Sequence, residues 1–374
     1  MTDIDRLARE DDAEHHHEAD AQRAPMLERV TRRAVLGGAG AGLSAALLAA
    51  CGSSGAAHTV TETIAGSPAP TLFDNHRTLR FTVVSHATRS PVFTPTHYGV
   101  ADACRLVGAS YQWVGSQNGN IDELLHALNF AVGARVDGIA TTLTDPGAFT
   151  APLSAARDAG IPVIAYESDA PDSGRLAYIG SDPHASGLQM GTRIATLLPG
   201  GGNIAVFISA PGDTNLRARL QGLRQGLAGS GVHADVVATG EGAGAQQATI
   251  NGYLPRHLDR HGFFALDGSS TSALANTIAG IGRAHVLAGG YDLTPETQQQ
   301  LAAGALQFAI DEQPYLQGFL AILQLYLYRV SGGLTGPANV DTGARFVDRH
   351  GVAAYVRSQS RFEGTGSSPG LQPA

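Results

Sequence analysis

The chain contains 374 residues, of which 43% are hydrophobic, and it carries a formal net charge of −8 at pH 7. This length is enough for two domains of ordinary size, each with its own core. The sequence has neither a basic run nor a basic patch with interleaved aromatic residues, which excludes nucleic acid as an expected partner.

The N-terminal segment has the organisation of an export signal. Arg32 and Arg33 form a twin-arginine motif, and the weakly apolar residues 34–50 that follow are rich in Gly and Ala. This stretch is short for a membrane-spanning helix, which needs about 20 strongly apolar residues. Residues 1–50 are therefore predicted to be an export and lipoprotein signal outside the fold. Export by the twin-arginine route and by the general secretory route both stay open.

Cys51 closes the run Leu-Ala-Ala-Cys, which is typical of a bacterial lipoprotein signal. We expect the protein to be exported and anchored by lipidated Cys51 to the outer face of the cell membrane, or to be located in the periplasm. Residues 51–78 are rich in Ser, Gly, Thr, Ala and Pro and are predicted to be a flexible tether. Cys104 is then left without a disulfide partner and is expected in a helical core. Residues 361–374 are predicted to be a disordered tail.

From residue 79 onwards, the sequence alternates short strands with helices. Apolar and β-branched runs predict strands at 79–85, 111–114, 136–140, 161–166, 203–208, 235–237, 262–266 and 284–288. Helical spacing of apolar residues predicts helices that end near 107 and 227 or span 121–132, 148–159 and 246–257. The alternation pauses near 180–200 and restarts. Such alternation implies an α/β fold with two doubly wound, parallel-sheet, Rossmann-like lobes.

Polar side chains follow nearly every predicted strand. In doubly wound sheets, ligands bind beyond the carboxyl ends of the strands, so these side chains are candidates for a binding site. Hydroxyl, carboxylate and Arg groups suit a sugar, because each sugar hydroxyl both donates and accepts a hydrogen bond. Aromatic rings can cover the apolar C–H face of such a ligand. Taken singly, each residue is equally compatible with a helix cap or a turn.

Six segments, taken in their order and spacing, resemble the ribose-type sugar-binding proteins of bacterial ABC importers, in the periplasmic binding protein type I family. The segments are 83–93, 137–145, 161–182, 217–222, 290–292 and 310–318. The resemblance implies two lobes joined by a hinge, with the ligand in the cleft between them. The N-lobe would combine 79–181 with 313–341, and the C-lobe would combine 182–312 with 342–360.

The resemblance also implies a set of ligand-binding residues. They are Ser90, Phe93, Thr142, Glu167, Asp169, Arg219, Asp267, Asp292 and Glu312. Arg219 and Asp292 match the family in residue type, and both are expected at a solvent-lined cleft where substitution has little effect on folding. Ser90, Thr142 and Asp267 stand where the family often has Asn, so a different pentose, a hexose or a polyol is as compatible as ribose. The register of Glu312 against Gln313 stays open.

The implied partners are an ABC permease and its ATPase, with the binding protein itself a monomer and with no cofactor or metal. A receptor or sensor of the same fold, for chemotaxis or an autoinducer-type ligand, stays open. A transcriptional repressor of this fold would need an N-terminal helix-turn-helix, where this chain has an export signal. An exported lipoprotein enzyme is disfavoured because the motif His-Glu-x-x-His and any Cys/His metal cluster are absent from the sequence, and the pattern Gly-x-Ser-x-Gly occurs only at 366–370, in the predicted disordered tail.

Overall fold

The computed structural model describes residues 62–64, 77–240, 242–282, 286–333, 336–353 and 355. The export motif, Cys51 and the C-terminal tail discussed above lie outside these residues. The chain divides into two units, Met1–Gly55 and Ala56–Ala374, and all described residues belong to the second. Among them, no helix is both long enough and apolar enough to cross a membrane.

One lobe, which we call the N-lobe, is built on a sheet with the strand order β1-β3-β2-β4-β5-β6-β12. The strands are β1 (Glu62–Ile64), β2 (Arg80–Ser85), β3 (Ser110–Gly115), β4 (Gly138–Thr141), β5 (Val163–Tyr166), β6 (Ala177–Gly180) and β12 (Asn339–Asp341). All neighbours are parallel except β1, which pairs antiparallel with β3.

Helices cover both faces of this sheet and bury a core on each. One face packs against α1 (Thr94–Val107) and α9 (Pro314–Val330), and the other against α2 (Ile121–Gly133) and α3 (Pro146–Asp158). Short 3-10 turns form at η1 (Pro91–Phe93) and η2 (Pro171–Ser173). Cys104 lies in the α1 core with 2% of its surface exposed, as the sequence predicts.

The other lobe, the C-lobe, is built on a sheet with the order β13-β11-β10-β9-β7-β8, parallel except for the β11–β13 pair. The strands are β7 (Gly202–Ile208), β8 (Val232–Ala238), β9 (Gly262–Ala265), β10 (Leu287–Tyr291), β11 (Phe308–Asp311) and β13 (Arg345–Val347). The helices are α4 (Pro183–Leu197), α5 (Thr214–Gly226), α6 (Ala243–Tyr253), α7 (Gly268–Ile281) and α8 (Pro295–Ala303), with a 3-10 turn η3 (Leu254–Arg256). Two parallel α/β lobes of the doubly wound type confirm the predicted fold class.

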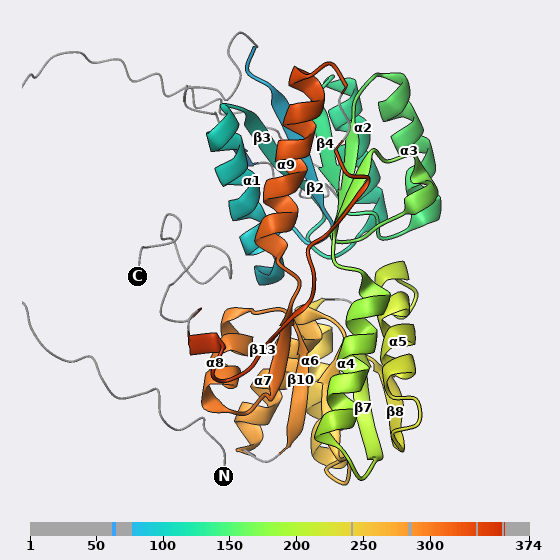
Figure 1. Cartoon of the computed structure of the whole chain (residues 1–374), viewed down its shortest axis with the longest axis vertical. Coiled ribbons are helices and arrows are strands. Elements are labelled where there is room, and N and C mark those ends of the chain that lie inside the picture. The colour runs from blue at the N-terminus through green and yellow to red at the C-terminus, as the bar shows by residue number, and fades with distance from the viewer. Residues whose placement is uncertain are drawn as a thin grey trace, which may run out of the picture. The chain divides into compact units, whose positions relative to one another are not determined.

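The chain passes between the two lobes at three places (Figure 1). The first crossover joins β6 to α4 through 181–182, the second joins β11 to α9 through 312–313, and the third joins β12 to β13 through 342–344. Each lobe is therefore assembled from segments that are distant in the sequence.

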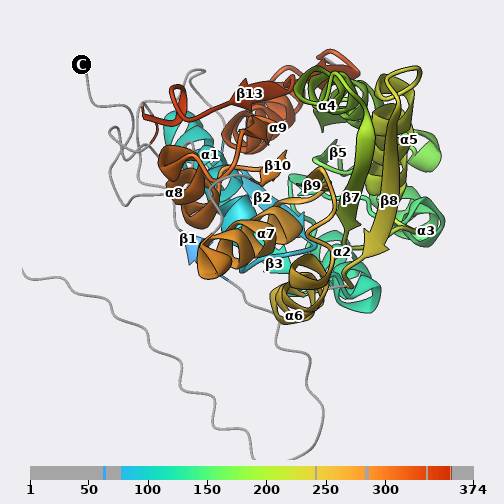
Figure 2. The same ribbon diagram turned by 90° about the horizontal axis from the view of Figure 1, so that it is seen from below.

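The pause near 180–200 in the predicted alternation is the helix α4. Its contact with α5 is built from glycines: a Cβ on Gly187 would lie 2.0 Å from the backbone oxygen of Arg219, and one on Gly222 would lie 2.0 Å from that of His184. Figures 1 and 2 show α4 and α5 side by side, and the buried face of α4 combines its glycines with Ser186, Met190 and Ile194. Small residues therefore occupy part of the stripe that large apolar side chains mark in most helices. Residues 62–64 also differ from the predicted flexible tether, since they add the edge strand β1.

Candidate functional site

A cleft of about 1190 Å³ lies beyond the carboxyl ends of the strands and is lined by residues of both lobes. The N-lobe contributes the segments that follow β2, β3, β4 and β5, and the C-lobe those that follow β7, β8, β9, β10 and β11. This is the location that the topology of parallel sheets predicts for a ligand.

Most of the residues expected to bind a ligand line this cleft. Those in the lining are Ser90, Phe93, Glu167, Arg219, Asp267, Asp292 and Glu312. Thr142 is instead fully buried, and its Oγ1 accepts a hydrogen bond of 3.2 Å from the backbone nitrogen of His86. Asp169 forms an ion pair with Arg175, whose Nη2 lies 2.6 Å from Oδ2. Neither Thr142 nor Asp169 is therefore among the residues that line the cleft.

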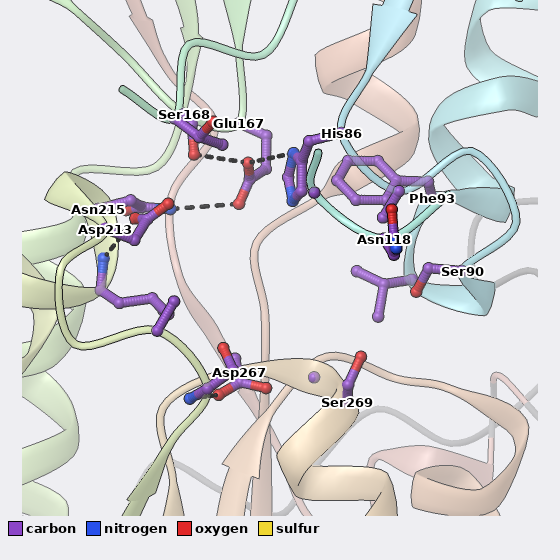
Figure 3. A pocket seen from close by; sticks show the side chains of 18 of the residues that line it. His86, Ser90, Phe93, Asn118, Glu167, Ser168, Asp213, Asn215, Asp267 and Ser269 are labelled. Carbon is purple, nitrogen blue, oxygen red and sulfur yellow. Dashed lines mark hydrogen bonds and ion pairs between the residues drawn. The ribbon is translucent and has the colours of Figure 1, made fainter. Parts of the chain in front are cut away.

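Glu167 forms the carboxylate of the N-lobe wall (Figure 3). Its Oε2 accepts a hydrogen bond of 2.8 Å from Ser168 Oγ, and its Oε1 accepts one of 3.2 Å from Asn215 Nδ2 across the cleft. Burial raises the pKa of this carboxyl from 4.5 to about 7. Its backbone has a φ of 62°, a left-handed conformation that is unusual for a non-glycine residue.

Two rings of the N-lobe stand beside this carboxylate. Phe93, at the end of η1, meets the ring of His86 edge-on with centroids 5.0 Å apart. His86 Nδ1 in turn lies 3.9 Å from Glu167 Oε2. An aromatic ring next to hydrogen-bonding groups is the combination that covers the two kinds of surface on a sugar.

Asp267 is the first carboxylate of the C-lobe wall and also the N-cap of α7. Its Oδ1 accepts a hydrogen bond of 2.8 Å from the backbone nitrogen of Ser270, and its Oδ2 accepts one of 2.9 Å from that of Ser209. Burial raises the pKa of this carboxyl. The cap and the cleft position are compatible, because each carboxylate oxygen can accept more than one hydrogen bond.

Asp292 is the second carboxylate of this wall and follows β10 with a φ of 69°. It lies against the first turn of α7, where a Cβ on Gly268 would be 2.3 Å from Asp292 Oδ2 and 2.8 Å from Val92 Cγ2 of the N-lobe. Any larger residue at position 268 would therefore have to displace the side chains of Asp292 and Val92, where the two lobes approach each other. Burial, and then the charge of Glu312, raise the pKa of Asp292 well above its ordinary value.

Arg219 and Glu312 form an ion pair at the back of the cleft, with side chains only 4% and 9% exposed. Arg219 Nη2 lies 2.8 Å from Oε1 and 2.7 Å from Oε2 of Glu312. Its Nη1 donates to the backbone oxygen of Leu266 at 2.7 Å, and the guanidinium carbon lies 3.8 Å from the ring centroid of Tyr291. Arg219 therefore lines the cleft as expected, but its charged group is packed and paired, so its substitution should affect folding more than the sequence suggests.

Several lining residues were not predicted from the sequence. They are His86, Asn118, Ser168, Asp213, Asn215 and Ser269. Asp213 could have been predicted as a lining residue, because it follows a predicted strand, β7, and precedes α5. Its Oδ1 also caps α5 by accepting a hydrogen bond of 3.1 Å from Leu216 N. Asn118 belongs to the loop after β3, where no ligand position was expected. Among the described residues, no group of His, Cys, Asp and Glu side chains could hold a metal ion.

Comparison with known proteins identifies the family. The model of the periplasmic binding protein domain matches residues 81–332. The chain is 38% identical over 309 residues to a xylose/arabinose-binding protein, XylF, of Sulfolobus acidocaldarius, a match that covers 78% of this chain and 76% of the relative.

Solved structures show the same architecture. A solute-binding protein of an ABC transporter from Burkholderia graminis, in complex with D-arabinose, has a TM-score of 0.70 at 25% identity and covers 76% of this chain and 99% of its own. A carbohydrate transporter from Acidothermus cellulolyticus, in complex with myo-inositol, has a TM-score of 0.69 at 25% identity and covers 78% and 100%. Because the family model spans more than half of the chain and the xylose/arabinose-binding relative is 38% identical, the chain belongs to the periplasmic binding protein family.

Proposed function

We propose that this chain is the extracytoplasmic substrate-binding component of an ABC importer and that it binds a small uncharged sugar or polyol in the cleft. The observation that carries the proposal is the convergence of Glu167, Asp267 and Asp292 with Phe93 on one cavity between two lobes. Carboxylates accept the protons of hydroxyl groups, and the ring covers C–H surface. The chain binds its ligand and releases it unchanged, so it is not an enzyme.

The first candidate ligand is a pentose of the xylose or arabinose type. The relative with 38% identity is named for these two sugars, and the Burkholderia structure contains D-arabinose. A cyclic polyol is the second candidate, since the Acidothermus structure contains myo-inositol. The N–H of Arg219 Nε has no hydrogen-bond partner among the described residues and would serve as a donor to a ligand oxygen.

A panel of ligands tests this proposal directly. Thermal unfolding of the protein would be followed with D-xylose, L-arabinose, D-arabinose, D-ribose, D-glucose and myo-inositol. A ligand present at 100 times its Kd adds about 2.7 kcal/mol to the free energy of unfolding, which raises the Tm measurably. The compounds that stabilise the protein would then be titrated calorimetrically. Failure of every neutral sugar and polyol to stabilise the protein would contradict the proposal.

We further propose that the protein acts outside the cytoplasm, held by a lipid on Cys51, and delivers its ligand as a monomer to a permease and its ATPase. The Leu-Ala-Ala-Cys sequence and the apolar stretch before it support this anchoring. One acyl chain gives only marginal binding, so two or three chains are expected. Cys51→Ala should release the protein from the membrane fraction or stall its processing. Normal processing and membrane retention of this variant would refute the lipid anchor.

A further inference from the structure

The three crossover segments meet at one residue, Glu312. Ser181 Oγ, in the first crossover, donates to Glu312 Oε1. Thr342 Oγ1, in the third crossover, donates to the backbone oxygen of Glu312 at 2.8 Å. Gln317 Nε2, in the N-lobe helix α9, donates to the same oxygen at 3.0 Å. Glu312 itself lies in the second crossover, so it contacts every segment that joins the lobes.

The same residue is connected to both walls of the cleft. Its carboxylate holds Arg219, which belongs to the C-lobe helix α5. On the other side, Tyr178 Oη lies 3.0 Å from the backbone oxygen of Ser181 and 2.8 Å from that of Glu167. The one hydroxyl proton of Tyr178 is shared between these two oxygens, so a path of contacts runs from Glu167 through Tyr178, Ser181 and Glu312 to Arg219.

The local backbone is shaped to keep this path closed. A Cβ on Gly180 would lie 2.2 Å from Tyr178 Oη, so only glycine leaves room for the hydroxyl beside the first crossover. Gln313, next to Glu312, has a φ of 61°, and its backbone nitrogen donates to Asp311 Oδ1 at 2.9 Å. Sparsely populated backbone conformations of this kind persist only where surrounding contacts enforce them, and they concentrate at sites that move or bind.

We propose that Glu312 is a positioning residue of the hinge, which holds Arg219 in its place on the cleft wall and couples the three crossovers to it. The Glu312 carboxylate accepts from Arg219 and from Ser181, so it acts on a ligand through Arg219. This inference rests on the proposed function only where it concerns ligand binding. The hydrogen-bond network around Glu312 is formed entirely by residues of the protein. A buried charge without its partner is costly, so loss of this carboxylate would displace Arg219 and loosen the crossovers.

Four variants separate this role from a general contribution to stability. Glu312→Gln removes the charge that holds Arg219. Ser181→Ala removes one hydrogen bond to Glu312 and leaves the cleft lining untouched, since Ser181 is not part of it. Thr277→Val is the control for a buried hydroxyl outside the crossovers. Thr277 is 5% exposed, as is Ser181, and the substitution removes its hydrogen bonds to Asn251, Gln247 and the backbone oxygen of Ala273, all within α6 and α7. Ser181→Thr, which keeps the hydroxyl, should behave as the wild type.

The first measurement needs no ligand. Small-angle X-ray scattering of the full-length protein reports the distribution of distances between the lobes. We expect this distribution to broaden in Glu312→Gln and in Ser181→Ala, and to stay as in the wild type in Thr277→Val and Ser181→Thr. The proposal would be overturned, whatever the ligand is, if Ser181→Ala scattered like the wild type and the folded Glu312→Gln protein did so as well.

The second measurement uses D-xylose, or the strongest stabiliser in the ligand panel, and the fluorescence of Trp113. Trp113 is the single Trp of the chain, and its Nε1 donates at 3.4 Å to the backbone oxygen of Thr88, in the loop after β2. We expect Kd to rise about fivefold in Ser181→Ala and about 30-fold or more in Glu312→Gln. Thr277→Val should keep the wild-type Kd even if its Tm falls.

The two measurements separate the ligand from the hinge role. If the wild type binds no sugar but the scattering of the hinge variants broadens as expected, the proposed ligand is refuted and the hinge role stays supported. A wild-type Kd in both hinge variants would overturn the hinge role alone.

Discussion

The two walls of the cleft hold their carboxylates in different ways. On the C-lobe side, both oxygens of Asp267 accept from backbone nitrogens, and Arg219 is fixed by Leu266, Glu312 and the ring of Tyr291. On the N-lobe side, Glu167 accepts hydrogen bonds from two side chains, Ser168 and Asn215, and the second of these belongs to the opposite lobe. The C-lobe wall is therefore set by the fold, whereas the N-lobe wall depends on how the lobes meet.

This difference has a consequence for binding. Groups that are fixed before the ligand arrives cost little ordering when it binds, so the C-lobe wall is preorganised. The contact between Glu167 and Asn215 can change when the lobes move, which makes the N-lobe wall the adjustable side. Substitutions in the C-lobe wall should then change stability or affinity strongly, and substitutions around Glu167 should act more weakly and depend on pH.

The largest effect is expected from Arg219→Met. The substitution leaves the Glu312 carboxylate buried without its cation, and breaking a buried ion pair from one side costs about 3–5 kcal/mol. Urea unfolding measures the change. The double variant Arg219→Met/Glu312→Gln should recover part of the loss, because no unpaired charge remains. A change below about 1 kcal/mol in the single variant would mean that the C-lobe wall is not held by this pair.

The second largest effect is expected from Asp292→Asn, which should weaken ligand binding. Asn retains the shape and tolerates the left-handed backbone of residue 292, so the fold should be preserved. The amide replaces a charged acceptor of hydroxyl protons, and a charge-assisted hydrogen bond contributes about 1.5–3 kcal/mol, so Kd should rise about 10- to 150-fold. Calorimetric titration with the best ligand measures it. An unchanged Kd at an unchanged Tm would show that Asp292 only supports the turn after β10.

Much of the fold could be predicted because its signals are local. The β-branched runs at 80–85 and 202–208 are buried strands, and the helix at 121–133 has both its apolar spacing and its Asn120 cap in the sequence. The helix α4 was missed because its packing depends on glycines such as Gly187. The strand β1 was missed because three residues carry no pattern, and only the open edge of β3 gives them a partner.

The candidate site was predictable where a residue immediately follows a strand. Asp267 and Asp292 could be found this way, and Glu167 as well. Thr142 and Asp169 also lie near strand ends. The hydrogen bond of Thr142 with His86 and the ion pair of Asp169 with Arg175 decide their roles, and both are tertiary contacts. Asn215 reaches Glu167 from the other lobe, and no local pattern encodes a contact across a cleft. The pairing of Arg219 with Glu312 is likewise a product of the three crossovers.

The adjustable wall should respond to pH. The folded-state pKa of Glu167 is raised from 4.5 to about 7, so the carboxyl is protonated in both the folded and the unfolded chain below pH 4.5. As the pH rises through 7, the folded protein must ionise this buried group, and its contribution to stability is lost. We expect Glu167 to lower the free energy of unfolding by about 1–2 kcal/mol between pH 5 and pH 8, because the group borders an open cleft.

Glu167→Gln isolates this contribution from the other carboxyls. Asp213, Asp267 and Asp292 also have raised pKa values and add slopes of the same sign. The variant and the wild type should be nearly equal in stability at pH 5, and the variant should become the more stable of the two by pH 8. Denaturant unfolding at each pH measures both. Parallel pH profiles would show that Glu167 does not titrate in this range.

The smallest effect is expected from Asn215→Ala, which removes the hydrogen bond between Glu167 and the opposite lobe. Ser168→Ala is its matched control, since it removes the other hydrogen bond of the same carboxylate without crossing the cleft. Each variant loses about 1 kcal/mol of hydrogen bonding, so their Tm values should fall alike. Only Asn215→Ala should also reduce the fraction of protein with the lobes in contact, which raises the apparent Kd about two- to fivefold, mainly through faster dissociation.

Stopped-flow fluorescence of Trp113 would resolve the association and dissociation rates of the ligand. Equal dissociation rates in the two variants would mean that the Glu167–Asn215 contact adds stability without linking the lobes, and the N-lobe wall would then be as fixed as the C-lobe wall.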